Sequence, residues 1–280
     1  MALDYTISYA GLTIGNGTAF PIMHADGLED LPPLRTGDLS IGQRDGETPG
    51  IDLAAGRDIT VDLIVFDTSP ALADYFTNIE RLKAATVPSV EQVFTYQVPG
   101  RLPRSLMARC RARSIPVSQD YQFRYGASSL AFHATDPRIY DAAFTSPSVG
   151  LPSASGGLTF NATANFVFGT AGTGGSLVAS NLGNYPAPWV AQIFGPVVNP
   201  SITLAASGMT VNFSGTINAG DVLTIDSLAR SVLLNGTASR YSLVVSPTQW
   251  FALPVGNSTI QFNAASGTGT LTFNYRSVWM

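Results

Sequence analysis

The feature that most constrains the fold is the segment from Gly220 to Gly236, whose pattern predicts a β-hairpin. Polar and apolar side chains alternate over residues 222–226, as they do in a strand with one buried face. Residues 231–234 form a second apolar run, which ends at Asn235-Gly236, a dipeptide that favours a tight two-residue turn. This part of the chain is therefore expected to consist of short strands that reverse direction at tight turns.

Similar runs recur along most of the chain and predict a mainly β fold. Glycine, proline and asparagine separate them, as is typical of turns. In the first half, the expected strands cover residues 5–9, 39–41, 59–66, 93–98, 107–115, 121–125 and 130–133. In the second half, they cover residues 160–168, 189–194, 201–204, 209–213, 222–225, 231–234, 241–245, 259–262 and 271–275. The close spacing of short strands in the second half favours a two-sheet β-sandwich.

One helix interrupts the strands of the first half. Ser69 is its expected N-cap, and Pro70 suits its first turn. An apolar stripe at helical spacing follows, formed by Leu72, Tyr75, Phe76, Ile79 and Leu82. Pro88 prevents the helix from continuing. The second half shows no helix signal.

Charge is distributed very unevenly along the chain. From Ala142 onward there are three arginines and two aspartates, a net charge of +1, with no glutamate, lysine or histidine. Residues 1–141 carry 12 basic and 17 acidic side chains, a net charge of −5. We therefore expect two domains, residues 1–141 and 158–280, joined by a Ser-, Pro- and Gly-rich linker at 142–157. A nearly uncharged surface suits a domain that packs against other proteins.

A series of short motifs gives a family resemblance. In order, they are Asn184-x-Pro186, Gly220-Asp-x-Leu-x-Ile-Asp226, Arg230-x-Val-x-x-Asn-Gly236, Trp250-x-x-Leu-x-x-Gly-Asn257 and Tyr275-Arg-x-x-Trp279. This order resembles the C-terminal domain of the distal tail proteins of long-tailed, non-contractile bacteriophages. Ala134-Thr-Asp-Pro-Arg138 is similar to the exit from the first domain of such proteins. The resemblance extends over both halves of the chain.

The resemblance implies an architecture and a role. The first domain is expected to be a split β-barrel related to the tail tube, with one helix, and the second a galectin-like β-sandwich. Such proteins are structural and require no cofactor. They form a homo-oligomeric ring, in sixes, which joins the tail-tube protein to the tail-tip hub and receptor-binding proteins. DNA is expected to pass through the channel without specific binding. We expect a virion protein of the tail tip, assembled in the host cytoplasm.

Bulk properties exclude several other classes of protein. No run approaches the ~20 apolar residues of a membrane span, and the N-terminus lacks the features of a secretory signal, so no membrane partner is expected. Cys110 is the single cysteine and rules out an internal disulfide. The net charge of −4 argues against a protein held to nucleic acid by phosphate contacts.

Candidate catalytic residues are few, and we predict that the chain is not an enzyme. His24 and His133 are the only histidines, and no Gly-x-Ser-x-Gly turn is present. Asp221 and Asp226 could form a carboxylate pair for glycosidic cleavage, but alternation points them to opposite sides, and both suit hairpin ends. The second half has no His, Glu or Cys to complete a metal site. A cell-wall hydrolase is therefore a remote alternative.

The basic cluster comprises Arg101, Arg104, Arg109, Arg111 and Arg113. Strict alternation places the last three on one face of a strand and turns Cys110 to the other, where a small buried thiol is expected. We interpret Arg109, Arg111 and Arg113 as possible subunit contacts. A solvated face and DNA binding are the alternatives.

The three tryptophans, Trp189, Trp250 and Trp279, allow a second functional hypothesis. They could stack on sugars, so a carbohydrate-binding host-adhesion module of the tail tip is the alternative function. The second half lacks the charged and histidine partners that usually hold sugar hydroxyls. Core or interface packing is therefore the favoured role of these residues.

Overall fold

The structure is a computed structural model that describes residues 5–67, 74–152 and 175–280. These residues form two compact units, one within residues 1–142 and the other within residues 143–279. Both units are built mainly of β strands, which confirms the predicted fold class. The strand expected at residues 160–168 and part of the expected linker lie outside the described ranges. Across those ranges, no helix is long and apolar enough to span a bilayer.

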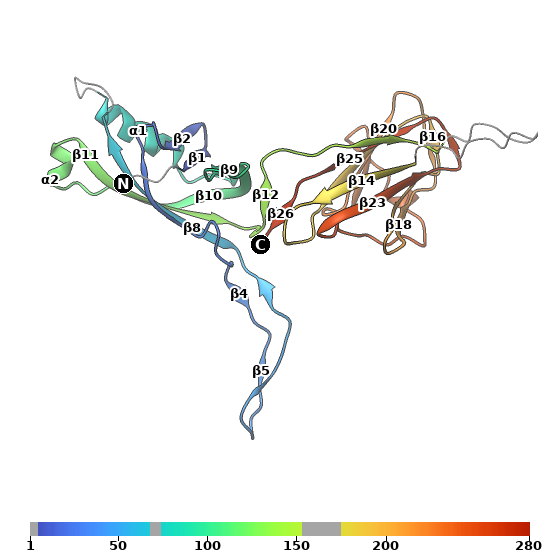
Figure 1. Ribbon diagram of the computed structural model, residues 1–280, viewed down its shortest axis with the longest axis horizontal. Coiled ribbons are helices and arrows are strands. Elements are labelled where there is room, and N and C mark those ends of the chain that lie inside the picture. The colour runs from blue at the N-terminus through green and yellow to red at the C-terminus, as the bar shows by residue number, and fades with distance from the viewer. Residues whose placement is uncertain (1–4, 68–73, 153–174) are drawn as a thin grey trace, which may run out of the picture. The chain divides into compact units, whose positions relative to one another are not determined.

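The first unit contains an antiparallel sheet whose strands are far apart in sequence (Figure 1). Short β12 (Ile139–Asp141) pairs with the start of β10. Alternate residues of β8 are fully buried, so one face of the sheet covers the core. In spatial order, the strands are β2 (Leu12–Gly15), β1 (Thr6–Tyr9), β9 (Gln92–Gln97), β10 (Arg104–Ser114), β11 (Tyr125–Ala134), β8 (Arg57–Phe66) and β3 (Ile22–Asp26).

Helix α1 (Tyr75–Ala85) confirms the predicted helix. Its expected cap, Ser69 and Pro70, lies outside the described residues, as does Leu72. The Asp67 carboxylate accepts hydrogen bonds from the backbone N–H groups of Asp74 and Tyr75 at 2.9 and 3.2 Å, so an acidic group lies at the positive end of the helix.

The apolar stripe of α1 is narrower than predicted. Tyr75, Ile79 and Leu82 are buried, and α1 contacts β8 and β2. Phe76 is 52% exposed. In the core, the Tyr9 and Phe132 rings lie 4.9 Å apart in edge-to-face geometry, which favours one well-defined packing.

A second helical turn, α2 (Gln119–Gln122), lies where the sequence predicts a strand over residues 121–125. The Tyr121 ring packs edge-on against Tyr75, with 5.6 Å between centroids. Arg124 has a positive φ of 61°, which ends the turn, and β11 begins at Tyr125. The strand predicted over residues 121–125 is therefore wrong up to Arg124, because the Tyr121 ring packs on helix α1 instead of on a sheet.

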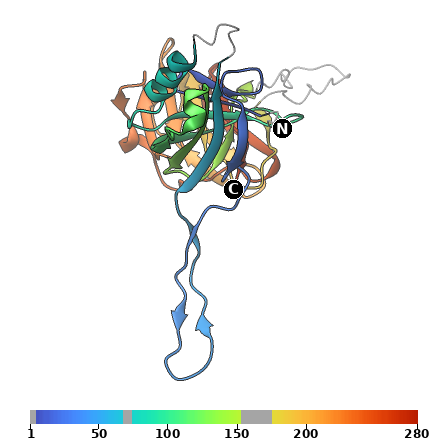
Figure 2. The same ribbon diagram turned by 90° about the vertical axis from the view of Figure 1, so that its left-hand side faces the viewer.

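Residues 31–56, which we call the arm, form a long hairpin between β3 and β8 (Figures 1 and 2). Only short stretches of the arm pair: β4 (Leu34–Arg35) with β7 (Leu53–Ala54), and β5 (Leu39–Ser40) with β6 (Glu47–Thr48). The arm's strands make few contacts other than with one another. Of the arm, the sequence predicts only a strand at 39–41.

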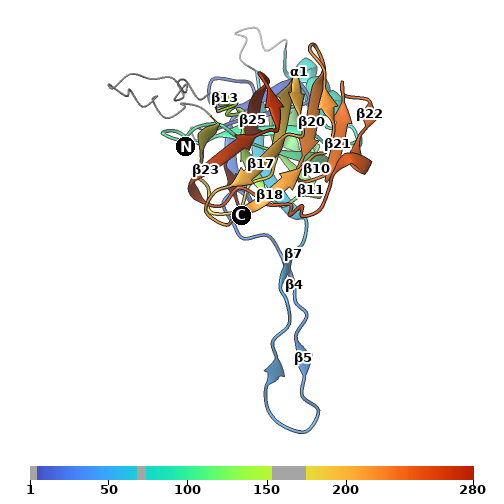
Figure 3. The same ribbon diagram turned by 90° about the vertical axis from the view of Figure 1, so that its right-hand side faces the viewer.

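The second unit contains two antiparallel sheets, and Figure 3 labels most of their strands. Alternate residues of β15 and β23 are buried, as expected for sheets that share a core. The six-stranded sheet has the order β13 (Ser148–Gly150), β25 (Thr270–Tyr275), β15 (Trp189–Phe194), β20 (Val222–Asp226), β21 (Ser231–Leu234), β22 (Ala238–Ser239). The four-stranded sheet has the order β14 (Ser176–Asn181), β23 (Gly256–Asn263), β17 (Ser201–Leu204), β18 (Met209–Asn212). Minor strands are β16 (Val197–Val198), β19 (Thr216–Ile217), β24 (Ser266–Gly267) and β26 (Val278–Trp279).

The predicted hairpin is present as β20 and β21. Asn235 and Gly236 have φ values of 52° and 75°, and the Thr237 N–H donates to the Leu234 carbonyl at 3.3 Å. Positive φ at both central residues is the signature of a type I′ turn, as the sequence predicts.

The strand expected at residues 241–245 is wrong. The segment forms a short 3-10 helix, η1 (Tyr241–Leu243), after the chain leaves the sheet. The Leu243 and Val244 N–H groups bond to the Arg240 and Tyr241 carbonyls. A five-residue apolar run does not distinguish a strand from a helical turn by its pattern alone.

Candidate functional site: a polar groove and the arginine strand

Each histidine is engaged with a carboxylate. His24 Nε2 lies 2.8 Å from Asp26 Oδ2, and His133 Nδ1 lies 2.6 Å from Asp58 Oδ1. Neither imidazole has a recorded hydrogen bond to a hydroxyl or thiol in the described part of the chain. A nucleophile–base pair requires such a bond.

The two aspartates of the second unit shape turns. Hydrogen bonds, the Asn235 side chain first among them, hold the pKa of the exposed Asp221 carboxyl below its usual range. Asp226 Oδ1 accepts the N–H groups of Leu228 and Ala229 at 2.8 and 2.9 Å. These are the turn roles that the sequence indicates for both residues. Among the described residues, no group of three or more His, Cys, Asp and Glu side chains could hold a metal ion.

Cys110 is the buried thiol that the sequence predicts. Its side chain is on the core face, and Sγ lies 3.4 Å from the Ala112 carbonyl oxygen. Burial raises the pKa of this thiol above its ordinary value. A raised pKa disfavours the thiolate, so Cys110 is not suited to nucleophilic chemistry.

The three arginines of β10 do not share one face. A bulge shifts the register between Cys110 and Ala112, so that Arg109 pairs with His133 on the open face and Arg113 pairs with Leu130 on the core face. The extra residue, Arg111, is exposed within the bulge. The expectation of a common face is wrong because a bulge interrupts strict alternation.

Arg113 has a partner inside its own unit. Its Nη1 donates to the Lys83 carbonyl at 2.9 Å and to Thr86 Oγ1 at 2.8 Å, at the C-terminal end of α1. A cation there satisfies free carbonyls and complements the helix dipole. Arg111 is also exposed and makes no such bond among the described residues, so it is the arginine of β10 that we expect to contact another molecule.

Trp189 is a core residue and cannot stack on a sugar. It is 1% exposed, and its ring lies 5.1 Å from the Phe273 ring in stacked geometry. Its indole N–H donates to the Phe251 carbonyl at 2.9 Å. The packing role favoured by the sequence is confirmed for this residue. Trp250 and Trp279 are half-buried.

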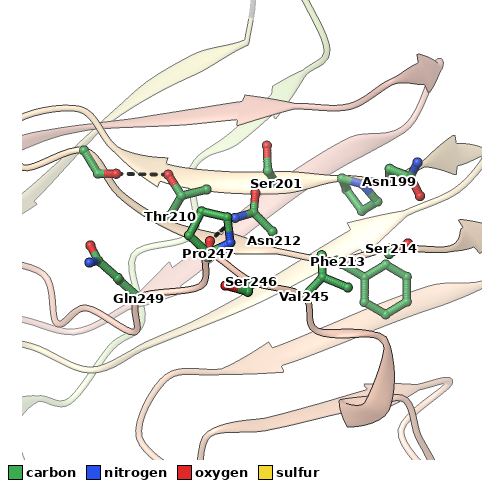
Figure 4. A pocket seen from close by; sticks show the side chains of 12 residues that line it. Asn199, Ser201, Thr210, Asn212, Phe213, Ser214, Val245, Ser246, Pro247 and Gln249 are labelled. Carbon is green, nitrogen blue, oxygen red and sulfur yellow. Dashed lines mark hydrogen bonds between the residues drawn. The ribbon is translucent and has the colours of Figure 1, made fainter.

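A groove of about 690 Å³ lies on the outer side of β17 and β18 in the second unit (Figure 4). The segment 245–249 forms its other wall, where the Gln249 N–H donates to the Thr210 carbonyl at 2.8 Å. Asn212 Nδ2 also donates to the Pro247 carbonyl. Figure 4 shows Gln249 at one end of the groove and Asn199 with Ser214 at the other.

None of the residues that line the groove is ionisable. Most of them carry hydroxyl or amide groups, and prolines, a valine and a nearly buried phenylalanine complete the lining. Sequence reasoning missed this groove, because its walls come from residues 199–201, 208–214 and 245–249. The only available signal was the shortage of charge throughout the second half.

A family model matches part of the second half of the chain. Residues 182–279 match the family model of the siphovirus-type tail component, C-terminal domain. This range includes most of the motifs on which the family resemblance was based. No curated protein matches the chain.

Three solved structures share the fold over nearly the full length of the chain. One, described as SPP1 Dit (gp 19.1), a hub of the adsorption apparatus in phages that infect Gram-positive bacteria, has a TM-score of 0.68 at 14% identity and 99% coverage of both chains. Two structures of the phage P2 baseplate in its activated conformation, with Ca and with Sr, have TM-scores of 0.52 and 0.51 at 10% identity. They cover 99% and 97% of this chain, and 98% and 97% of theirs.

The family match, the order of the motifs and the shared fold agree with one another. Residues 182–279 therefore carry the C-terminal domain of the siphovirus-type tail component, and the whole chain shares the fold of the SPP1 Dit hub protein.

Proposed function

We propose that this protein forms a closed ring of six copies that joins the tail tube to the tail-tip complex. The first unit makes the ring and leaves an axial channel through which DNA passes without specific binding. The ring is assembled in the host cytoplasm and needs no membrane. The second unit offers a docking surface to tail-tip hub or receptor-binding proteins.

Open strand edges in the first unit support a ring. Among the described residues, β2 pairs only with β1, and β3 pairs only with β8, so each end of the sheet has a free edge. Free edges are pairing sites for another chain unless something covers them. Because β2 and β3 are different strands, their pairing between copies is head-to-tail, and such contacts form a ring when the rotation from copy to copy closes.

The arm is the main support for a ring of several copies, because it exposes apolar side chains that its own unit does not cover. Leu39 and Ile51 are 70% and 79% exposed, and Leu31, Leu34 and Leu53 are also exposed. A row of exposed leucines and isoleucines on a sparsely paired hairpin is typical of an interaction surface. We assign it to the neighbouring copy in the ring.

A pair of arm substitutions tests this function. Leu39→Ser together with Ile51→Ser should reduce the mass in solution, measured by light scattering, from that of a ring to that of one chain. The far-ultraviolet circular dichroism spectrum should not change, because neither side chain belongs to a core. Leu228→Ser, at an exposed leucine in a turn of the second unit, is the matched control and should leave the ring intact. A double variant that still forms rings would show that the arm is not the subunit contact.

A further inference from the structure

We propose that the groove between β17–β18 and residues 245–249 is a binding site for a neutral saccharide. A volume of about 690 Å³ is within the range of pockets that hold small ligands. This inference does not depend on the ring, because every residue that lines the groove belongs to the second unit.

The lining determines the chemical class of the ligand. With no ionisable side chain in the groove, an anionic or cationic ligand has no counter-charge to replace its hydration. Hydroxyl and amide side chains both donate and accept hydrogen bonds, as sugar hydroxyls do. A neutral, polyhydroxylated ligand therefore matches the groove best.

Several of these groups are available to a ligand. Ser201, Ser246 and the Gln249 side chain have no recorded hydrogen bond within the described part of the chain. The three side chains come from both walls, so together they can contact opposite sides of one sugar ring (Figure 4). A sugar hydroxyl can therefore bond to these groups without breaking a hydrogen bond within the protein.

The walls are held in place before any ligand binds. Thr248 Oγ1 accepts the Asn212 N–H at 3.0 Å and donates to the Val245 carbonyl at 2.6 Å. The Val245 N–H bonds to the Asn212 carbonyl at 3.1 Å. Segment 245–249 is thus tied to the edge of β18 by backbone and side-chain bonds. A preformed site loses less conformational entropy on binding.

The four-stranded sheet beside the groove also carries uncharged side chains that can form hydrogen bonds. Thr203 pairs with Thr210 on one side and with Gln261 on the other, and Gln261 pairs with Ser176. This row of uncharged hydrogen-bonding side chains crosses the outer face of the four-stranded sheet. A polymeric saccharide seated in the groove can continue along it.

The experiment uses full-length protein on a printed array of neutral and anionic glycans. The strongest neutral binder is then titrated by calorimetry. We expect signals on neutral glycans and a Kd of about 1 mM or tighter for the oligosaccharide in solution. Gln249→Ala should weaken binding about 3- to 10-fold, the range for losing one hydrogen bond. Ser201→Phe should abolish binding by filling the groove.

Gln192→Ala is the matched control, since this glutamine lies on β15 of the six-stranded sheet and does not line the groove. It should change the Kd by less than the Gln249 variant does. Binding confined to anionic glycans, or equal weakening by both glutamine variants, would overturn the proposal. A silent array would overturn it too. If virions that carry Ser201→Phe then also lacked a tail protein, the groove would be assigned to protein docking.

Discussion

Arg57 is the residue on which the base of the arm depends. Its guanidinium is 1% exposed and makes no ion pair with a carboxylate in the described part of the chain. Nε donates to the Pro137 carbonyl at 2.9 Å, and Nη1 donates to the carbonyls of Gly27 and Asp30 at 2.8 and 2.5 Å. Burial lowers the pKa of Arg57, but a guanidinium stays charged at any ordinary pH. One side chain thus joins the start of the arm to the exit from the first unit.

Replacing Arg57 with methionine tests this role. The variant keeps most of the apolar stem but leaves three carbonyl oxygens without their donor. We expect the free energy of unfolding of the first unit to fall by about 2 kcal/mol or more in urea titrations. Arg44→Met, at an exposed arginine in the arm, is the control and should stay within about 0.5 kcal/mol of the parent. Equal stability of the two variants would refute the role of Arg57.

Gly236 is the residue whose backbone conformation sets the tight turn between β21 and β22. Its φ is +75°, and a Cβ added there would meet no atom within 4 Å. The cost of Gly236→Val is therefore backbone strain without a clash. We expect the second unit to lose about 1 kcal/mol or more of stability, measured by chemical denaturation. Gly150→Val is a useful control, because space is open there too but φ is not positive. Equal losses at both positions would contradict this explanation.

At the scale of elements, the bulge in strand β10 gives arginines that are close in sequence different structural roles. Arg113 closes the end of α1, whereas Arg111 is exposed at the bulge. We predict that Arg113→Ser lowers the stability of the first unit by about 1 kcal/mol without preventing assembly. Arg111→Ser should instead weaken assembly and leave stability within about 0.5 kcal/mol.

Light scattering and chemical denaturation, applied to both variants, separate these effects. Both variants replace an arginine of β10 with serine, so each variant is the control for the other. If Arg111→Ser assembles normally but loses retention on duplex DNA at moderate salt, the partner at the bulge is nucleic acid instead of protein.

Elements with regular alternation could be predicted from the sequence, and elements set by tertiary contacts could not. The strand at Ser201–Leu204 and the turn at Asn235-Gly236 follow from local pattern and turn chemistry. The Tyr121 ring instead packs on α1, and residues 241–243 form a 3-10 helix instead of a strand. The bulge in β10 also carries no sequence signal, because Arg111 continues the regular alternation of arginine with small residues over 109–113.

The candidate site was harder to predict than the fold. The composition indicated that the nearly uncharged second half packs against other molecules without ion pairs. The motifs indicated a family resemblance. The groove itself brings together residues 199–201 and 245–249, which are distant in sequence. Similarly, the arm gives only one short strand signal, although its exposed Leu39 and Ile51 are among the clearest interaction features in the structure.

At the scale of the whole molecule, the two units differ in their charge and in the surfaces that they offer to other molecules. The first carries most of the charge, the free sheet edges and the arm, all of which suit contacts between copies. The second is nearly uncharged and has a polar groove, which suits partners outside the ring. The central claim is that the first unit closes a ring of six.

The mass of the purified protein in solution tests this claim most directly. Size-exclusion chromatography with multi-angle light scattering should give about six times the 29.5 kDa of one chain. The mass should stay at that value on dilution through the micromolar range, because closing a ring satisfies every head-to-tail contact. A mass of 29.5 kDa throughout that range, or a mass that grows continuously with concentration as in an open filament, would contradict the account.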